Sequence, residues 1–124
     1  MIDTINVLAL AYLGDSVYEV YIREYLIKQG IQNVNELQEQ AIKYVSAKGQ
    51  AYYLKQLIDN QILTEQELSI VHRGRNHKSH KAPKNTDINT YKLATGFEAL
   101  IGYLHLDNQI DRINDIIKYI ESRW

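Results

Sequence analysis

The stretch Leu8–Glu19, LALAYLGDSVYE, places the pair Gly14-Asp15 inside a run of residues suited to burial. A second stretch, Thr95–Leu106 (TGFEALIGYLHL), does the same with Glu98. A carboxylate among core residues is costly unless it is paired or binds a cation. Two such acids, distant in sequence but each on an apolar helix, could therefore converge on one metal ion.

The rest of the chain shows one periodicity. Apolar residues recur at three-to-four spacing, and the sequence contains a single proline, Pro83. Capping signals occur at Asn35 with Gln38, at Ser46, and at Thr64 with Glu67. This pattern predicts an all-helical fold. We expect helices at about residues 4–28, 35–45, 47–58, 64–72, 87–106 and 109–122, with a loop over 73–86.

Size and composition restrict the class of protein. At 124 residues the chain is expected to be a single domain, residues 1–124, long enough to bury a core. It has no cysteine, which excludes disulfides and zinc–thiolate sites. The N-terminus lacks the pattern of a signal peptide, and no apolar run approaches the roughly 20 residues that span a bilayer. We therefore expect a cytoplasmic protein without membrane contact.

The two motifs resemble those of a known family. LALAYLGDSVYE resembles the signature helix of ribonuclease III, in which an aromatic residue, a leucine, Gly-Asp and a small residue follow one another. Phe97–Asp107, FEALIGYLHLD, is similar to the second conserved helix, whose Phe-Glu-Ala carries another active-site acid. The short length and the RGRN…PKNTD segment narrow the resemblance to the Mini-III subfamily, which lacks a double-stranded-RNA-binding domain. The resemblance runs from about Ile5 to Asp107.

The resemblance implies a ribonuclease III-type endonuclease domain of about six to seven helices acting as a symmetric homodimer. It assigns Asp15 and Glu98 to a catalytic Mg²⁺ site, with Mn²⁺ as a possible substitute. The expected reaction is metal-dependent hydrolysis of double-stranded RNA to 5′-phosphate and 3′-hydroxyl ends. Tyr12 holds the position of the aromatic residue at the dimer two-fold axis. Phe97 is assigned to the same interface, with a place in the protomer core as the alternative.

Some acids of the family pattern are replaced here. Ala11 stands four residues before Asp15, where the signature has a glutamate, and Leu8 stands where it has another. Thr95 occupies the position of an aspartate three residues before Glu98. Glu19 is a candidate substitute ligand. A competing interpretation ends a helix at Gly14 and leaves Asp15 in a solvated turn.

The segment 73–86 carries a second candidate site. No acidic residue occurs between Leu68 and Thr86, although the net charge of the chain is −1. The alternative is a solvated basic loop without function, but its length exceeds what a compact helical domain needs. Cationic side chains would bind phosphates, and the asparagines could reach ribose hydroxyls. The predicted RNA-binding residues are Arg73, Arg75, Asn76, Lys78, Lys81, Lys84 and Asn85.

Three functions are compatible with these features. The first is the endoribonuclease, which the resemblance associates with maturation of the 23S ribosomal RNA precursor and, as a candidate partner, with a ribosomal protein helper. The second is a non-cleaving module that binds structured RNA or the ribosome, an alternative suggested by Ala11 and Thr95. The third is a helical protein-interaction dimer, which would leave the acid-free basic segment unexplained.

Overall fold

The computed structural model describes residues 2–78 and 83–123. Within these ranges the chain forms a 3₁₀ turn and six α-helices, and no strand. This confirms the all-helical prediction. The elements are η1 (Ile2–Thr4), α1 (Val7–Lys28), α2 (Val34–Val45), α3 (Ala47–Asp59), α4 (Glu65–Arg75), α5 (Ile88–Leu106) and α6 (Ile110–Ser122).

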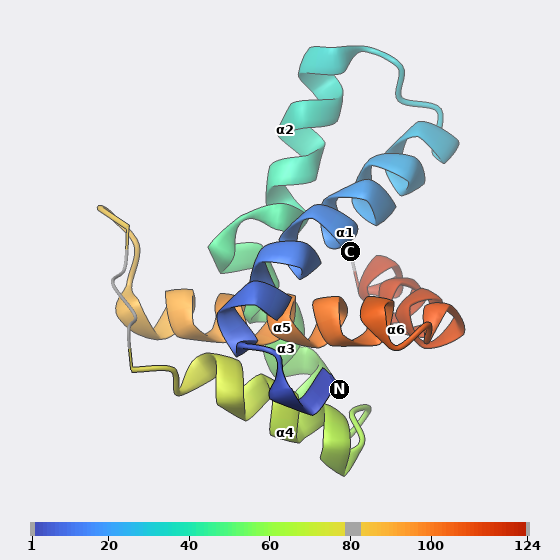
Figure 1. Ribbon diagram of the computed structural model, residues 1–124. Coiled ribbons are helices and arrows are strands. Elements are labelled where there is room, and N and C mark those ends of the chain that lie inside the picture. Colours follow the sequence, from blue (N-terminus) through green and yellow to red (C-terminus); the bar gives the residue numbers. More distant parts are fainter. Residues whose placement is uncertain (1, 79–82, 124) are drawn as a thin grey trace.

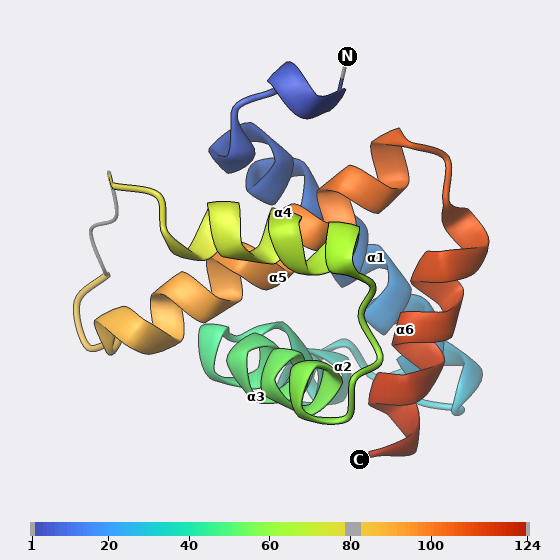
Figure 2. The same cartoon turned by 90° about the horizontal axis from the view of Figure 1, so that it is seen from below.

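Helix α5 lies at the centre of the molecule. Helices α1, α3 and α4 pack around it, α6 covers its C-terminal part, and α2 joins α1 to α3 (Figures 1 and 2). From Ala94 to Leu104 every residue of α5 except Glu98 is buried. A helix that is apolar all round belongs in the interior of a protein. Glu98 is thus the single acidic side chain in the most enclosed part of the fold's central helix.

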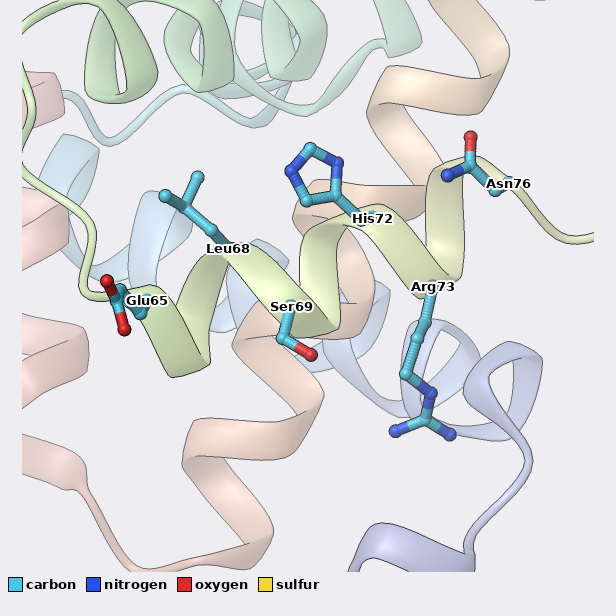
Figure 3. A pocket seen from close by; sticks show the side chains of 6 residues that line it. All are labelled: Glu65, Leu68, Ser69, His72, Arg73 and Asn76. Atoms are coloured by element: carbon cyan, nitrogen blue, oxygen red, sulfur yellow. The ribbon is translucent and has the colours of Figure 1, made fainter.

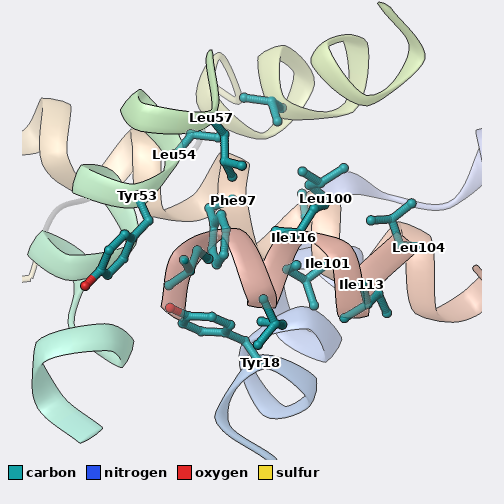
Figure 4. Packing of buried hydrophobic residues seen from close by; sticks show 14 of the residues in the cluster. Tyr18, Tyr53, Leu54, Leu57, Phe97, Leu100, Ile101, Leu104, Ile113 and Ile116 are labelled. Carbon is teal, nitrogen blue, oxygen red and sulfur yellow. The ribbon is translucent and has the colours of Figure 1, made fainter. Parts of the chain in front are cut away.

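The core around α5 is aromatic at the end nearest Glu98. Phe97 contacts Tyr18 of α1 edge to face, with ring centroids 4.8 Å apart (Figure 4). The hydroxyl of Tyr18 donates to the main-chain oxygen of Tyr44 at 3.1 Å, so this buried hydroxyl is satisfied. Phe97 has 0% exposed surface. Its assignment to a dimer interface is therefore wrong, because the protomer's own core encloses the ring completely.

Helices α1 and α5 cross at two glycines. A Cβ atom at Gly14 would overlap the carbonyl oxygen of Glu98, and one at Gly102 would overlap that of Leu10. The two backbones are thus in direct contact, which a side chain at either glycine would prevent. Helix α1 runs unbroken through Gly14, so the interpretation that placed Asp15 in a turn is wrong.

The predicted helix ends are mostly confirmed, with three corrections. Helix α1 begins at Val7 and is capped by Asn6, instead of beginning at about residue 4. Ser46 caps α3, and Thr64 caps α4 in a capping box. Helix α2 is capped by Asn33, whose side chain accepts from the backbone of Glu36, and not by Asn35. Helix α4 continues beyond His72 to Arg75, since Gly74 packs closely against Gly96 of α5.

Candidate active site

The crossing of α1 and α5 brings two carboxylates together. Asp15 lies on α1 next to Gly14, and Glu98 lies on α5 at the point that Gly14 contacts. Asp15 is exposed, Glu98 is half-buried, and their carboxyl groups lie within hydrogen-bonding reach of each other. Residues 83 positions apart in the sequence therefore form one site, open to solvent on the Asp15 side.

The environment of Glu98 opposes its ionisation. Burial raises the pKa of this carboxyl most, and the hydrogen bond and negative charge of Asp15 raise it further. A hydrogen bond from Gln50 acts in the opposite direction, and the resulting pKa is about 8. Two adjacent carboxylates that cannot both ionise readily are a frequent property of functional sites. A cation placed between them would favour the doubly ionised pair.

Gln50 is a site residue that the sequence analysis did not identify. It lies in the first turns of α3 and is 1% exposed. Its Nε2 donates to Oε2 of Glu98 at 3.4 Å and to the main-chain oxygen of Val45 at 3.2 Å. The available signal was a polar residue on the apolar face of a predicted helix, in line with Leu54 and Leu57.

The positions where family acids are replaced contain well-packed residues. Ala11 is buried, and Thr95 is buried with its hydroxyl donating to the main-chain oxygen of Tyr91 at 3.0 Å. Glu19, the candidate substitute ligand, forms an ion pair with Arg23 at 3.3 Å. Within residues 2–78 and 83–123 no three acidic or histidine side chains gather at a metal-binding distance. The site of the described chain is thus a carboxylate pair.

The predicted RNA-binding residues separate into two groups. Arg73 is half-buried on α4 and donates to the main-chain oxygen of Ile5 at 3.2 Å, so it ties α4 to the N-terminal segment. Arg75 also lies on α4 rather than in the loop. Lys81 lies outside the described residues. The exposed members of the set are Arg75, Asn76, Lys78, Lys84 and Asn85.

A surface groove of about 740 Å³ lies along α4. His72 and Arg73 point to opposite sides of the helix, and Asn76 marks its C-terminal end (Figure 3). The other lining residues are Glu65, Leu68 and Ser69. Neither Asp15 nor Glu98 lines this groove, so it is separate from the carboxylate pair.

Tyr12, the residue expected at the dimer two-fold axis, is a large apolar side chain left in solvent. It is 84% exposed and lies on α1, three residues before Asp15. Exposure of this kind leaves it available to a second copy of the chain. The homodimer itself stays a prediction.

Comparison with known proteins agrees with this arrangement. The Ribonuclease III domain matches residues 8–109, which include both carboxylates. The chain belongs to the ribonuclease III family. Ribonuclease III domains act on double-stranded RNA as endoribonucleases. The assignment made from the two sequence motifs is thus confirmed.

Curated members of the ribonuclease III family resemble this chain over nearly its whole length. Mini-ribonuclease 3 of Enterococcus faecalis is 49% identical over 93% of this chain and 87% of its own. The Streptococcus pneumoniae protein of that name is 45% identical over 95% of this chain and 92% of its own. A crystal structure of a Fusobacterium nucleatum protein has a TM-score of 0.84 and 32% identity, covering 96% of this chain and 93% of that one.

No helix in the part of the chain that the structure describes combines the length and apolarity needed to cross a membrane.

Proposed function

We propose that this chain is a Mg²⁺-dependent endoribonuclease that cleaves double-stranded RNA at the Asp15–Glu98 site. The observation that carries the proposal is the meeting of these two carboxyl groups across the α1–α5 crossing, within a ribonuclease III domain. The reaction adds water at phosphorus and breaks the bond to the 3′ oxygen. It leaves a 5′-phosphate on one product and a 3′-hydroxyl on the other.

The residues present fit Mg²⁺. This cation keeps several waters and is usually held by one or two carboxylates together with substrate phosphates. A pair of carboxylates open on the side of Asp15 satisfies that requirement, and leaves coordination positions for RNA. Mn²⁺ accepts the same oxygen ligands and can replace it. When bound, the cation supplies Lewis-acid stabilisation of the negative charge that develops on the phosphate oxygens.

The protein's own contribution is positioning and electrostatics. The α1–α5 crossing fixes the separation of Asp15 and Glu98, and Gln50 holds one oxygen of Glu98. Exposed cationic side chains at the end of α4 and in the following loop, among them Arg75 and Lys84, bind the RNA backbone without regard to sequence. Asn76 and Asn85 are exposed beside them and can hydrogen-bond to ribose hydroxyls.

The active form that we propose is a symmetric homodimer, with the exposed ring of Tyr12 at its two-fold axis. Two-fold symmetry suits an antiparallel duplex, because each protomer can address one strand. Replacing Tyr12 by Arg should then shift the protein from dimer to monomer in sedimentation equilibrium. A Tyr12→Arg variant that stays dimeric would remove Tyr12 from the interface.

For the biological substrate we propose the precursor of 23S ribosomal RNA, processed in the cytoplasm. The support is the similarity to proteins named Mini-ribonuclease 3 and the family resemblance of the two motifs. Depletion of the protein should lead to accumulation of precursor with unprocessed ends, measured by primer extension. Normal mature ends after depletion would contradict this assignment.

Activity is tested with purified protein, long duplex RNA and Mg²⁺. Asp15→Asn should abolish cleavage and keep binding, because the amide retains the shape of the carboxylate but not its charge. Asp59→Asn is the matched control, since Asp59 is an exposed residue on α3. Cleavage by Asp15→Asn at the wild-type rate would refute the assignment of the site.

One alternative retains support from specific residues. Ala11 and Thr95 replace acids of the family pattern and are buried without charge, which favours a domain that binds structured RNA or the ribosome without cutting it. In the same experiment this alternative predicts salt-sensitive binding by the wild-type protein and no cleavage at any Mg²⁺ concentration. Absence of RNA binding altogether would favour a protein-interaction dimer.

A further inference from the structure

We propose that Gln50 is a positioning residue that holds the Glu98 carboxylate in the orientation that binds the catalytic cation. This inference rests on the proposed function, because it assigns a task to Gln50 at the same site. Gln50 does not touch RNA or the scissile phosphate in this proposal. It acts through Glu98.

The hydrogen bonds of Gln50 determine which way its amide points. The two hydrogens of Nε2 are directed to two acceptors, Oε2 of Glu98 at 3.4 Å and the main-chain oxygen of Val45 at 3.2 Å. Val45 is the last residue of α2, where carbonyl groups lack partners within the helix. The main-chain oxygen of Val45 can only accept a hydrogen bond, so it must face the amide nitrogen of Gln50. The same nitrogen, and not the amide oxygen, therefore faces Glu98.

The backbone around Gln50 is fixed as firmly as its amide. Ser46 ends α2 and caps α3, accepting from the backbone N–H of Gly49 at 3.0 Å. A Cβ at Gly49 would overlap the carbonyl oxygen of Lys43, so the corner between the helices closes without space for a side chain there. Gln50 follows directly and is 1% exposed. The donor therefore reaches Glu98 from a rigid corner, and not from a flexible surface side chain.

The hydrogen-bonding balance of Gln50 argues against a purely structural role. Its Oε1 is buried without a partner among the described residues. A buried polar atom left unpaired costs about 1–3 kcal/mol, whereas an apolar residue of the same shape would avoid that cost. A structural position on the apolar face of α3, in line with Leu54 and Leu57, would be better served by Met or Leu. The amide is thus explained by what it does for Glu98.

The chemical consequence is control of one carboxylate. The N–H donor of Gln50 orients Oε2 of Glu98, and it favours the charged form of the carboxyl group. Partners that orient metal-binding side chains typically change metal affinity by about 10–100-fold when they are removed. Loss of the Gln50 donor should therefore weaken cation binding more than it weakens the fold.

The test removes the amide group of Gln50 and keeps the volume of its side chain. Gln50→Met removes both donors, and Gln50→Leu is the second variant should the first not fold. The dissociation constant for Mn²⁺ is measured from the electron paramagnetic resonance signal of the free ion, without RNA. We expect it to rise at least 10-fold in the Gln50 variant. Cleavage should fall in kcat at limiting Mg²⁺ and recover as Mg²⁺ is raised, with an unchanged KM for RNA.

The matched control is Leu57→Val, a buried substitution on the same helix whose side chain has no polar group to offer Glu98. It should lower thermal stability without changing the Mn²⁺ dissociation constant. An unchanged constant in Gln50→Met, or absence of Mn²⁺ binding to the wild-type protein, would overturn the proposal. If the wild-type protein binds Mn²⁺ through Glu98 and does not cleave RNA, the proposed function fails. Weaker binding in Gln50→Met would still support the positioning role.

Discussion

Replacing Glu98 by Gln should stabilise the metal-free protein while abolishing its activity. The amide has nearly the shape of the carboxyl group, and it can donate to Asp15 and accept from Gln50 as the present geometry requires. What it removes is a buried group that resists ionisation. The gain in stability of the Glu98→Gln protein should therefore depend on pH, whereas the effect of a simple packing change would not.

The magnitude follows from the pKa of Glu98, raised from 4.5 to about 8 by burial and then by Asp15. Below pH 4.5 the carboxyl is protonated in both the folded and unfolded chain, and it contributes no difference. As pH rises, the unfolded chain ionises first, so the wild-type protein loses stability up to about pH 8. The loss is at most about 3 kcal/mol at pH 7, and solvent beside the exposed Asp15 should reduce it to about 1–2 kcal/mol.

The assay is thermal unfolding in EDTA, followed by circular dichroism between pH 5 and pH 8.5. Glu98→Gln should unfold at nearly the wild-type temperature at pH 5 and about 4–8 °C higher at pH 8. Mg²⁺ should then raise the Tm of the wild-type protein only. The control Glu39→Gln changes an exposed carboxyl on α2 and should show neither effect. A Glu98→Gln protein that is no more stable than wild type at pH 8 would refute the reasoning.

Three further outcomes are expected. Arg112→Met should cost about 3–5 kcal/mol in urea unfolding, because it leaves the buried Glu67 without its 2.7 Å partner. Burial raises the pKa of Glu67, but Arg112 and Thr64 lower it more, so the net shift is downward. The stability of the wild-type protein should therefore fall as acid protonates Glu67. An Arg112→Met protein as stable as wild type at pH 7 would contradict the predicted loss. Gly14→Ala should prevent native folding, since its methyl group would overlap the Glu98 carbonyl oxygen; a native circular dichroism spectrum would be the contrary result. Lys84→Ala should weaken RNA binding and reduce its salt slope by about 0.9, and an unchanged slope would remove Lys84 from the interface.

Much of the fold could be predicted from the sequence because its helices carry local signals, namely capping residues and apolar periodicity. Ser46 and Thr64 cap helices as their side chains suggest, and the apolar periodicity gives α5 and α6 within one or two residues. Asn33 was missed as the cap of α2, since Asn35 offers an equally good local signal two residues later. Which of two nearby asparagines caps a helix depends on the path of the preceding turn, and local sequence does not determine that path.

The candidate site was predictable in its acids and not in their surroundings. Asp15 and Glu98 stood out because each is a charged residue within an apolar run, which is visible in the sequence alone. Gln50 did not stand out, because its value depends on a partner 48 residues away. Likewise Arg73 looks like any other cation of its segment until the fold places it beside the main-chain oxygen of Ile5. Positions defined by long-range contacts need the structure.

The glycine contacts between α1 and α5 have a consequence for how such a protein can diverge. Because main chain touches main chain at Gly14 and Gly102, the spacing of the two helix backbones that carry Asp15 and Glu98 is fixed. The segment between α4 and α5 joins α5 at Ile88, well before Glu98, so changes in its length or charge leave that spacing in place. The preference for one RNA over another can therefore change between related proteins while the carboxylate site that cleaves the RNA stays the same.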